Sequence, residues 1–256
     1  MNATREQMLA EAFVQAADTL LEDFDILEFL HGLTGHCVQL LDVDAAGVML
    51  ADPKGQLHAT AASSENARLL ELFELQADAG PGLDAYRSAA AVVNTDLAAN
   101  QDRWPRFAEA AHAAGYASVH ALPLRLRAVI VGVLNLFCAN SGTLSDADAH
   151  VGQALADVAT IAILAQRERH QAEQLAGQLQ RALSNRVTIE QAKGVLAERR
   201  GVSVDSAFTL LRDHARSHNQ HLTDLARQIT DGTSTATELL TGPQHTNTDA
   251  QRPEPA

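Results

Sequence analysis

Apolar residues recur along this chain with changing periods, and the changes separate its regions. Phe24, Leu27, Leu30 and Leu33 stand three positions apart, which predicts helices within residues 5–41. Short apolar runs between turn residues follow from 43 to 138 and predict strands, with a hairpin around Pro53-Lys54-Gly55. The predicted elements are strands at 43–52, 56–63, 90–94, 116–126 and 128–138, helices at 65–76 and 103–115, and a glycine-containing loop at 79–88.

This order of helices and strands predicts an α+β domain, with one antiparallel sheet flanked by helices. A pocket between the sheet and the helices is the expected ligand site of such a domain. No residue pattern marks a particular ligand, so the ligand-binding residues stay unassigned.

A long helix is predicted from Ser145, which provides an N-cap followed by first-turn acids, to about Arg181. Alternating steps of three and four residues pick out a stripe in which seven of eight residues are apolar: Val158, Ile161, Ala165, Glu168, Ala172, Leu175, Leu179 and Ala182. This stripe is typical of a coiled-coil seam and predicts a parallel homodimer. The alternative is a single amphipathic helix that packs on its own domain.

Three short helices are predicted after the long one, over 186–201, 206–217 and 221–229. Gly201 ends the first of them and Ser203 caps the second. The last residues are rich in Thr, Gln and Pro and predict a disordered tail. The predicted organisation is an N-terminal helix in 1–24, an α+β domain at 25–165, a connecting coiled-coil helix at 145–182, an all-α domain at 183–231 and the tail at 232–256.

Charge is distributed unevenly along the chain. The formal net charge is −13, yet residues 181–230 carry eight basic and five acidic side chains. An acidic protein with one basic region repels polyanions everywhere except at that region, which favours a nucleic acid as its partner. The alternative is chance scatter of charges over a short segment.

Small and basic residues share the outer face of the predicted helix at 186–201. At about 100° per residue, Gly194 and Ala197 fall on one arc, with Arg186, Lys193 and Arg200 at its border. A glycine inside a helix costs about 1 kcal/mol relative to alanine, and close approach of another molecule is one reason to retain it. This face therefore fits a phosphate backbone with bases lying on the helix. The alternative is that Gly194 only relieves crowding.

Several other classes of function leave no signature. Cys37 and Cys138 stand in apolar surroundings and form neither a disulfide framework nor a metal cage, so no metal and no cofactor is expected. No catalytic constellation stands out, and we expect a protein that is not an enzyme. The sequence shows no signal peptide and no apolar run of membrane-spanning length, which predicts a cytoplasmic protein without membrane contact.

The all-α region resembles a known family. IEQAKGVLAERRG at 189–201, AFTLLRDHARSHNQHLTDLA at 207–226 and ALSNR at 182–186 are similar to the ANTAR domain of bacterial transcription antitermination regulators. Family members often have Met at the position of Ala197. The resemblance implies binding to tandem hairpins in nascent RNA, which prevents a terminator hairpin from forming. A dimer would supply one ANTAR domain per hairpin.

The α+β region is similar to the GAF sensor domains of actinobacterial GAF–ANTAR proteins. The resemblance covers about 25–165 and rests on AGPGLDAYRS at 79–88, Asn94-Thr95-Asp96, Trp104-Pro105 and LPLRLRAVIVGVLNLF at 122–137. PAS domains share this architecture and are the alternative.

Nine residues are candidates for RNA binding. The basic ones would contact phosphates or loops, the glutamine amide would read a base, and the alanine and glycine would be points of close approach. They are Arg186, Gln191, Ala192, Lys193, Gly194, Arg199, Arg200, Arg212 and Arg216.

Three other functions stay open. A DNA-binding regulator is the main alternative, because SHNQ at 217–220 joins two predicted helices as in a helix-turn-helix motif. A pure dimerisation or partner-binding module would show no salt-dependent binding of nucleic acid. An enzyme would need a catalytic group that the sequence does not mark.

Overall fold

The protein divides into two compact units, Met1–His170 and Gln171–Ala256. The structure is a computed structural model that describes residues 5–18, 25–141 and 144–232. The predicted tail therefore lies outside the described residues from 233 onward. None of the described helices combines the length and the hydropathy that crossing a bilayer requires.

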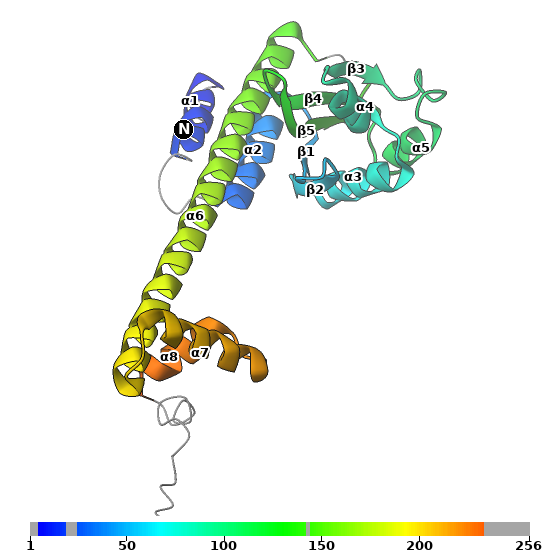
Figure 1. The fold of residues 1–256 in the computed structure, drawn as a ribbon. Coiled ribbons are helices and arrows are strands. Elements are labelled where there is room, and N and C mark those ends of the chain that lie inside the picture. The colour runs from blue at the N-terminus through cyan, green and yellow to red at the C-terminus, as the bar shows by residue number, and fades with distance from the viewer. Residues whose placement is uncertain (1–4, 19–24, 142–143, 233–256) are drawn as a thin grey trace, which may run out of the picture. The chain divides into compact units, whose positions relative to one another are not determined.

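Within the described residues, the first unit holds a sheet of five antiparallel strands (Figure 1). Their order across the sheet is β2-β1-β5-β4-β3. The strands are β1 (Ala45–Ala51), β2 (Leu57–Ala62), β3 (Val92–Asp96), β4 (Ser118–Leu126) and β5 (Val129–Cys138). The predicted hairpin around Pro53-Lys54-Gly55 is present, and Gly55 adopts a φ of 81°, a backbone conformation that favours glycine. Strands β4 and β5 pair as a second hairpin.

Helices cover both faces of this sheet (Figure 1). One face packs against α1 (Arg5–Asp18), α2 (Ile26–Leu40) and the first part of α6 (Asp146–Arg200). The other face packs against α3 (Glu65–Ala77), α4 (Pro81–Ser88) and α5 (Pro105–Ala113). Residues of β1 alternate between the faces, with Ala46 and Val48 on the first and Ala45 and Met49 on the second. The predicted α+β fold is confirmed.

The prediction of a loop at 79–88 is wrong, because most of this segment forms helix α4. Pro81 occupies the first turn of α4, where its fixed φ suits a helix and its missing N–H would have had no partner in the helix. Gly80 precedes it as the N-cap, and Ala89 ends the helix in the left-handed conformation. Glycine and proline here begin a helix instead of preventing one.

The predicted break between the long helix and the first helix of the all-α region is also absent. Helix α6 continues to Arg200 because no proline interrupts it, and it accommodates Gly177 and Gly194. The second unit therefore consists of the end of α6 with two short helices, α7 (Val204–Ser217) and α8 (Leu222–Thr230). This three-helix arrangement follows the predicted all-α fold, but its first helix is part of a longer one.

Candidate nucleic-acid interface

An apolar core holds the three helices of the second unit together. Each helix places small or branched aliphatic residues toward the other two, and the spacing of three and four residues puts them on one face. The fully buried members are Ala192, Leu196, Ala207, Leu211, Ala215, Leu225, Ala226 and Ile229. Ala192 is thus a core residue with no exposed surface, and its predicted contact with RNA is not available in this structure.

Local signals end and begin the helices of this unit. Gly201 has a φ of 62° and stops α6 in the left-handed conformation. Ser203 then caps α7, because its hydroxyl accepts the N–H of Ser206 at 3.2 Å. Asn219, with a φ of 50°, turns the chain between α7 and α8. These short connections fix the faces of α6 and α7 that remain outside the core.

The other candidate residues lie outside the core, on two of the helices. Six of the nine are exposed: Arg186, Gln191, Gly194 and Arg199 on α6, and Arg212 and Arg216 on α7. Arg200 is half-buried at the end of α6. The structure therefore exposes polar and basic candidate residues on both α6 and α7, whereas the small and basic face predicted from the sequence lay on α6 alone.

Lys193 is the most enclosed of the basic candidates. Its side chain is 14% exposed, and its Nζ donates to both carboxylate oxygens of Glu190 at 2.9 and 3.0 Å. The same Nζ lies 5.4 Å from the ring centroid of Phe208, a half-buried residue of α7. The ammonium group thus forms an ion pair within α6 and reaches α7 through a cation–π contact. A phosphate would have to compete with Glu190 for it.

The surroundings of Gly194 decide between two interpretations of this residue. A Cβ added at Gly194 would meet no atom within 4 Å outside its own helix backbone. Relief of crowding is therefore not the reason for a glycine here. A glycine at this exposed position leaves the helix backbone open to closer approach than a side chain would allow.

A hollow at the α7–α8 turn adds basic surface that sequence reasoning described only in part. It has a volume of about 400 Å³ and is lined by Arg212 and Arg216 together with Asn219, Gln220 and His221. His221 is the N-cap of the nine-residue helix α8 and makes no side-chain capping hydrogen bond among the described residues. The signal in the sequence was the pair of arginines one helical turn apart before the polar SHNQ segment.

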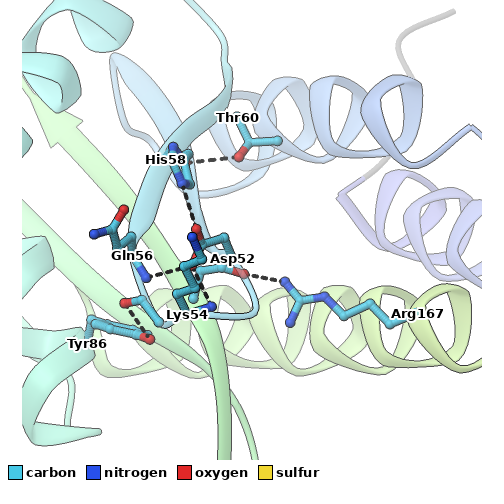
Figure 2. Close-up of polar contacts among 9 residues, drawn as sticks. Asp52, Lys54, Gln56, His58, Thr60, Tyr86 and Arg167 are labelled. Atoms are coloured by element: carbon cyan, nitrogen blue, oxygen red, sulfur yellow. Dashed lines mark hydrogen bonds and ion pairs between the residues drawn. The ribbon is translucent and has the colours of Figure 1, made fainter. Parts of the chain in front are cut away.

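Figure 2 shows how the β1–β2 hairpin of the first unit is ordered. Asp52 Oδ1 accepts the backbone N–H groups of Lys54 and Gln56 at 2.8 and 2.9 Å. Donation from Gln56 holds the pKa of the Asp52 carboxyl below its ordinary value. His58 adds a contact between its Nε2 and Asp52 Oδ2 at 3.5 Å.

The same hairpin is tied to two helices. Arg167 Nη2 of α6 donates to the carbonyl oxygen of Ala51 at 2.6 Å, and the Tyr86 hydroxyl of α4 donates to the carbonyl oxygen of Gly55 at 3.4 Å (Figure 2). These two hydrogen bonds therefore join the hairpin to α4 and to the first part of α6.

Comparisons with known proteins identify both regions. A family model for the GAF domain matches residues 25–164, and one for the ANTAR domain matches residues 177–229. No curated protein matches the chain. An X-ray structure of free methionine-R-sulfoxide reductase from Neisseria meningitidis in complex with its substrate is similar at 17% identity, with a TM-score of 0.51, and the match covers 66% of this chain and 96% of that chain.

A second solved structure, the GAF domain of a phosphoenolpyruvate-protein phosphotransferase from Coxiella burnetii, is similar at 13% identity with a TM-score of 0.50. This match covers 66% of this chain and 99% of that chain. At such identities the likeness shows the fold alone. An ANTAR domain is an RNA-binding antitermination module and a GAF domain is a sensor domain, so the chain belongs to the GAF domain family and is a GAF–ANTAR regulator of transcription.

Proposed function

We propose that this regulator binds two adjacent hairpins in nascent RNA as a homodimer, and that holding them prevents a terminator hairpin from forming. The observation that carries the proposal is the open surface at Gly194, which accepts close approach of another molecule beside the polar and basic groups of α6 and α7. Bases of an RNA loop can lie on such a surface, because their flat faces need room and their edges need hydrogen-bonding groups.

The two parts of this surface have different chemistry. Gln191, Glu190 and Glu198 are exposed within about 60° of Gly194 around the helix axis. Carboxylates repel phosphates but accept hydrogen bonds from base amino groups. A glutamine amide can both donate and accept hydrogen bonds at a base edge. The face around Gly194 therefore reads bases.

Phosphate binding falls to the arginines farther from Gly194. Arg212 and Arg216 line the hollow beside α8, and Arg186 borders the base-reading face at about 80° from Gly194. Arg199 lies at about 140° from Gly194, on the other side of the helix, and contributes to the general positive field.

The dimer rests on an apolar stripe of α6 in the second unit. Leu175, Leu179, Leu183 and Val187 are 66%, 61%, 52% and 55% exposed, although they recur one helical turn apart. Burial against the same stripe of a second copy would remove them from water. Earlier in α6, Leu155, Ala159 and Ile163 are buried in the first unit, so the helix both packs on its own domain and offers a stripe to a partner.

The test is binding of the purified full-length protein to a tandem-hairpin RNA from the leader of its own operon, across a salt series. We expect tight binding that weakens with salt, and Arg212→Ala and Arg216→Ala should each reduce the slope of log affinity against log salt by about one. Gln191→Ala should relax base preference in the loops and leave the slope unchanged. Arg227→Ala is the matched control, because Arg227 is exposed on α8 beside Asp224 and outside both parts of the surface.

Two outcomes would overturn this proposal. Equal affinity for duplex DNA and for hairpin RNA would favour the helix-turn-helix alternative. Absence of salt-dependent binding to either nucleic acid, in a protein whose dimer is confirmed by light scattering, would favour a dimerisation module.

A further inference from the structure

Helix α3 buries two glutamates beside Leu70, while two of its other leucines stay exposed. Glu71 and Glu74 are fully buried, whereas Leu69 is 52% exposed and Leu72 is 36% exposed. Burial of a carboxyl group is unfavourable unless partners satisfy it, and exposure of leucine gives up hydrophobic stabilisation. A local departure of this kind from the hydrophobic pattern is expected where function requires it.

Residues without large side chains make room for these carboxyl groups. A Cβ on Gly47 of β1 would overlap the carboxylate of Glu71, and a Cβ on Gly80 would overlap that of Glu74. Asn135 of β5 is flanked in the sheet by Gly47 on one side and by Ala121 on the other. The apolar layer between the sheet and the helices α3 and α4 is therefore interrupted by a polar cluster of Glu71, Glu74 and Asn135.

The hydrogen bonds within this cluster leave three acceptors unused. Asn135 Nδ2 donates to Glu71 Oε1 at 3.1 Å, and the backbone N–H of Leu83 donates to Glu74 Oε1 at 3.0 Å. The second oxygen of each carboxyl group and the Oδ1 of Asn135 are buried and have no hydrogen-bond partner among the described residues. When both carboxyl groups are ionised, all three unsatisfied atoms are acceptors, so the group that would complete the cluster in that state is a donor with several N–H or O–H bonds.

Electrostatics indicates that this donor carries a positive charge. Burial raises the pKa of Glu71 well above its ordinary value and that of Glu74 to about 7, and the negative charges of Glu74 and Asp84 act in the same direction. Two arginines of this layer pair with other carboxylates, Arg103 with Asp84 at 2.8 Å and Arg87 with Asp78. A bound cation would compensate the buried carboxylates, as no side chain of the cluster does.

A pocket lies beside this region. It has a volume of about 380 Å³, lies between the β1–β2 hairpin and helix α4, and is lined in part by Leu57, Leu75, Leu83 and Tyr86. Leu83 thus lines the pocket and also donates its backbone N–H to Glu74. One residue separates the pocket from the cluster.

We propose that Glu71, Glu74 and Asn135 form a binding site for a small organic cation with several N–H groups, namely an amidinium, guanidinium or primary ammonium group. Two carboxylates and an amide oxygen match the N–H groups of such a cation, and a planar amidinium can bond a carboxylate through two parallel hydrogen bonds. The site supplies the ligand class of the GAF domain, and its role as a signal rests on the proposed function above. Tyr86 and Arg167, which contact the hairpin, connect the pocket wall to α6.

Binding of probe cations to the full-length protein tests the site directly. Acetamidinium, methylguanidinium, methylammonium and agmatine would be titrated by calorimetry at constant ionic strength. Neutral acetamide, which has the shape of acetamidinium without its charge, and Mg²⁺ and Ca²⁺ serve as comparison solutes. We expect saturable binding of at least one organic cation, with an affinity that rises with pH through about 7 as Glu74 loses its proton.

Isosteric variants decide whether the binding uses this site. Glu71→Gln and Glu74→Gln should each weaken binding by about tenfold or more, because each removes a charge-assisted hydrogen bond. Glu65→Gln is the matched control, since Glu65 lies on the same helix but is exposed and paired with Arg68. Circular dichroism of each variant checks that it folds.

The proposal is overturned if no organic cation of the panel binds, if acetamide or a divalent cation binds as well as acetamidinium, or if both glutamine variants retain wild-type affinity. RNA binding would be measured on the same preparations. Loss of RNA binding with intact cation binding would remove only the RNA proposal, and the reverse result would remove only the cation site.

Discussion

Glycine serves opposite purposes in the two units of this protein. In the GAF unit, Gly47 and Gly80 leave room that the protein's own buried carboxyl groups fill. In the ANTAR unit, Gly194 leaves room that no part of the described chain enters. Gly47 and Gly80 are therefore part of a folded interior, whereas we propose that Gly194, among polar and basic groups, admits another molecule.

Charge follows the same division. The carboxyl groups of Glu71 and Glu74 are buried, so their charge depends on protonation and on any cation bound beside them. The guanidinium groups of Arg186, Arg212 and Arg216 are exposed, so dissolved salt screens them. We therefore expect the GAF unit to respond to pH and the ANTAR unit to ionic strength.

The largest expected effect is a loss of GAF stability as the pH rises. The pKa of Glu74 is raised from 4.5 to about 7 in the folded protein, so the folded state binds more protons than the unfolded state between these values. The stabilisation that this carboxyl group contributes is fully present below about pH 4.5 and is lost as the pH rises through 7. The loss for this group is about 3 kcal/mol. Glu71 changes the stability in the same direction. Urea unfolding in an amine-free buffer across this range would measure it.

Two variants sharpen this result. Glu74→Gln should flatten the decline, because the amide does not titrate, while Glu65→Gln should leave it unchanged because Glu65 is exposed. A decline of equal steepness in Glu74→Gln would mean that another group causes it.

The next effect in size is the replacement of an interior glycine. Gly47→Ala should lower the free energy of unfolding by about 1 to 3 kcal/mol, since the new methyl group overlaps the Glu71 carboxylate and this side chain is fully buried. Thermal or urea unfolding monitored in the GAF unit would measure the loss. The matched control is Gly35→Ala on α2, where a Cβ would meet nothing within 4 Å. Equal stability of wild type and Gly47→Ala would show that Glu71 moves at little cost.

The fold of both units could be predicted from the sequence because most apolar spacings matched the structure. Strands ended at turns such as Pro53-Lys54-Gly55, and Gly201 ended a helix where expected. Helix α4 was mistaken for a loop because Gly80 and Pro81 are typical of loops and also of a helix start. Only the three-dimensional position of the segment beneath the sheet decides between these uses.

The interior cluster could not be predicted for a related reason. In α3 the leucines Leu69 and Leu72 alternate with glutamates, and an apolar stripe is the ordinary choice for the buried side. The structure buries Glu71 and Glu74 instead, because glycines on other elements provide space for them. Those glycines lie outside α3, so helical periodicity within α3 carries no sign of them.

A smaller effect is expected at the link between the hairpin and α6. Arg167→Ala removes the donor to the Ala51 carbonyl oxygen and should destabilise the GAF unit by about 1 kcal/mol. Urea unfolding would detect this change, and Arg68→Ala provides the control because Arg68 makes an exposed ion pair within one helix. Equal losses in the two variants would mean that the link to the hairpin contributes no more than a surface ion pair.

The smallest expected change in stability is also the one that separates the two uses of glycine most clearly. Gly194→Ala should raise the free energy of unfolding of the ANTAR unit by somewhat less than about 1 kcal/mol, because alanine favours the helix and the added methyl group meets no neighbour. The same variant should weaken binding of tandem-hairpin RNA, since the methyl group holds the bases away from the helix. Gly177→Ala on the same helix, where a Cβ would meet only Arg181 Nη2 at 3.9 Å, should stabilise without loss of RNA affinity. Higher stability with unchanged RNA affinity in both variants would exclude Gly194 from the interface, whereas a loss confined to Gly194→Ala would place the RNA on the open face of α6.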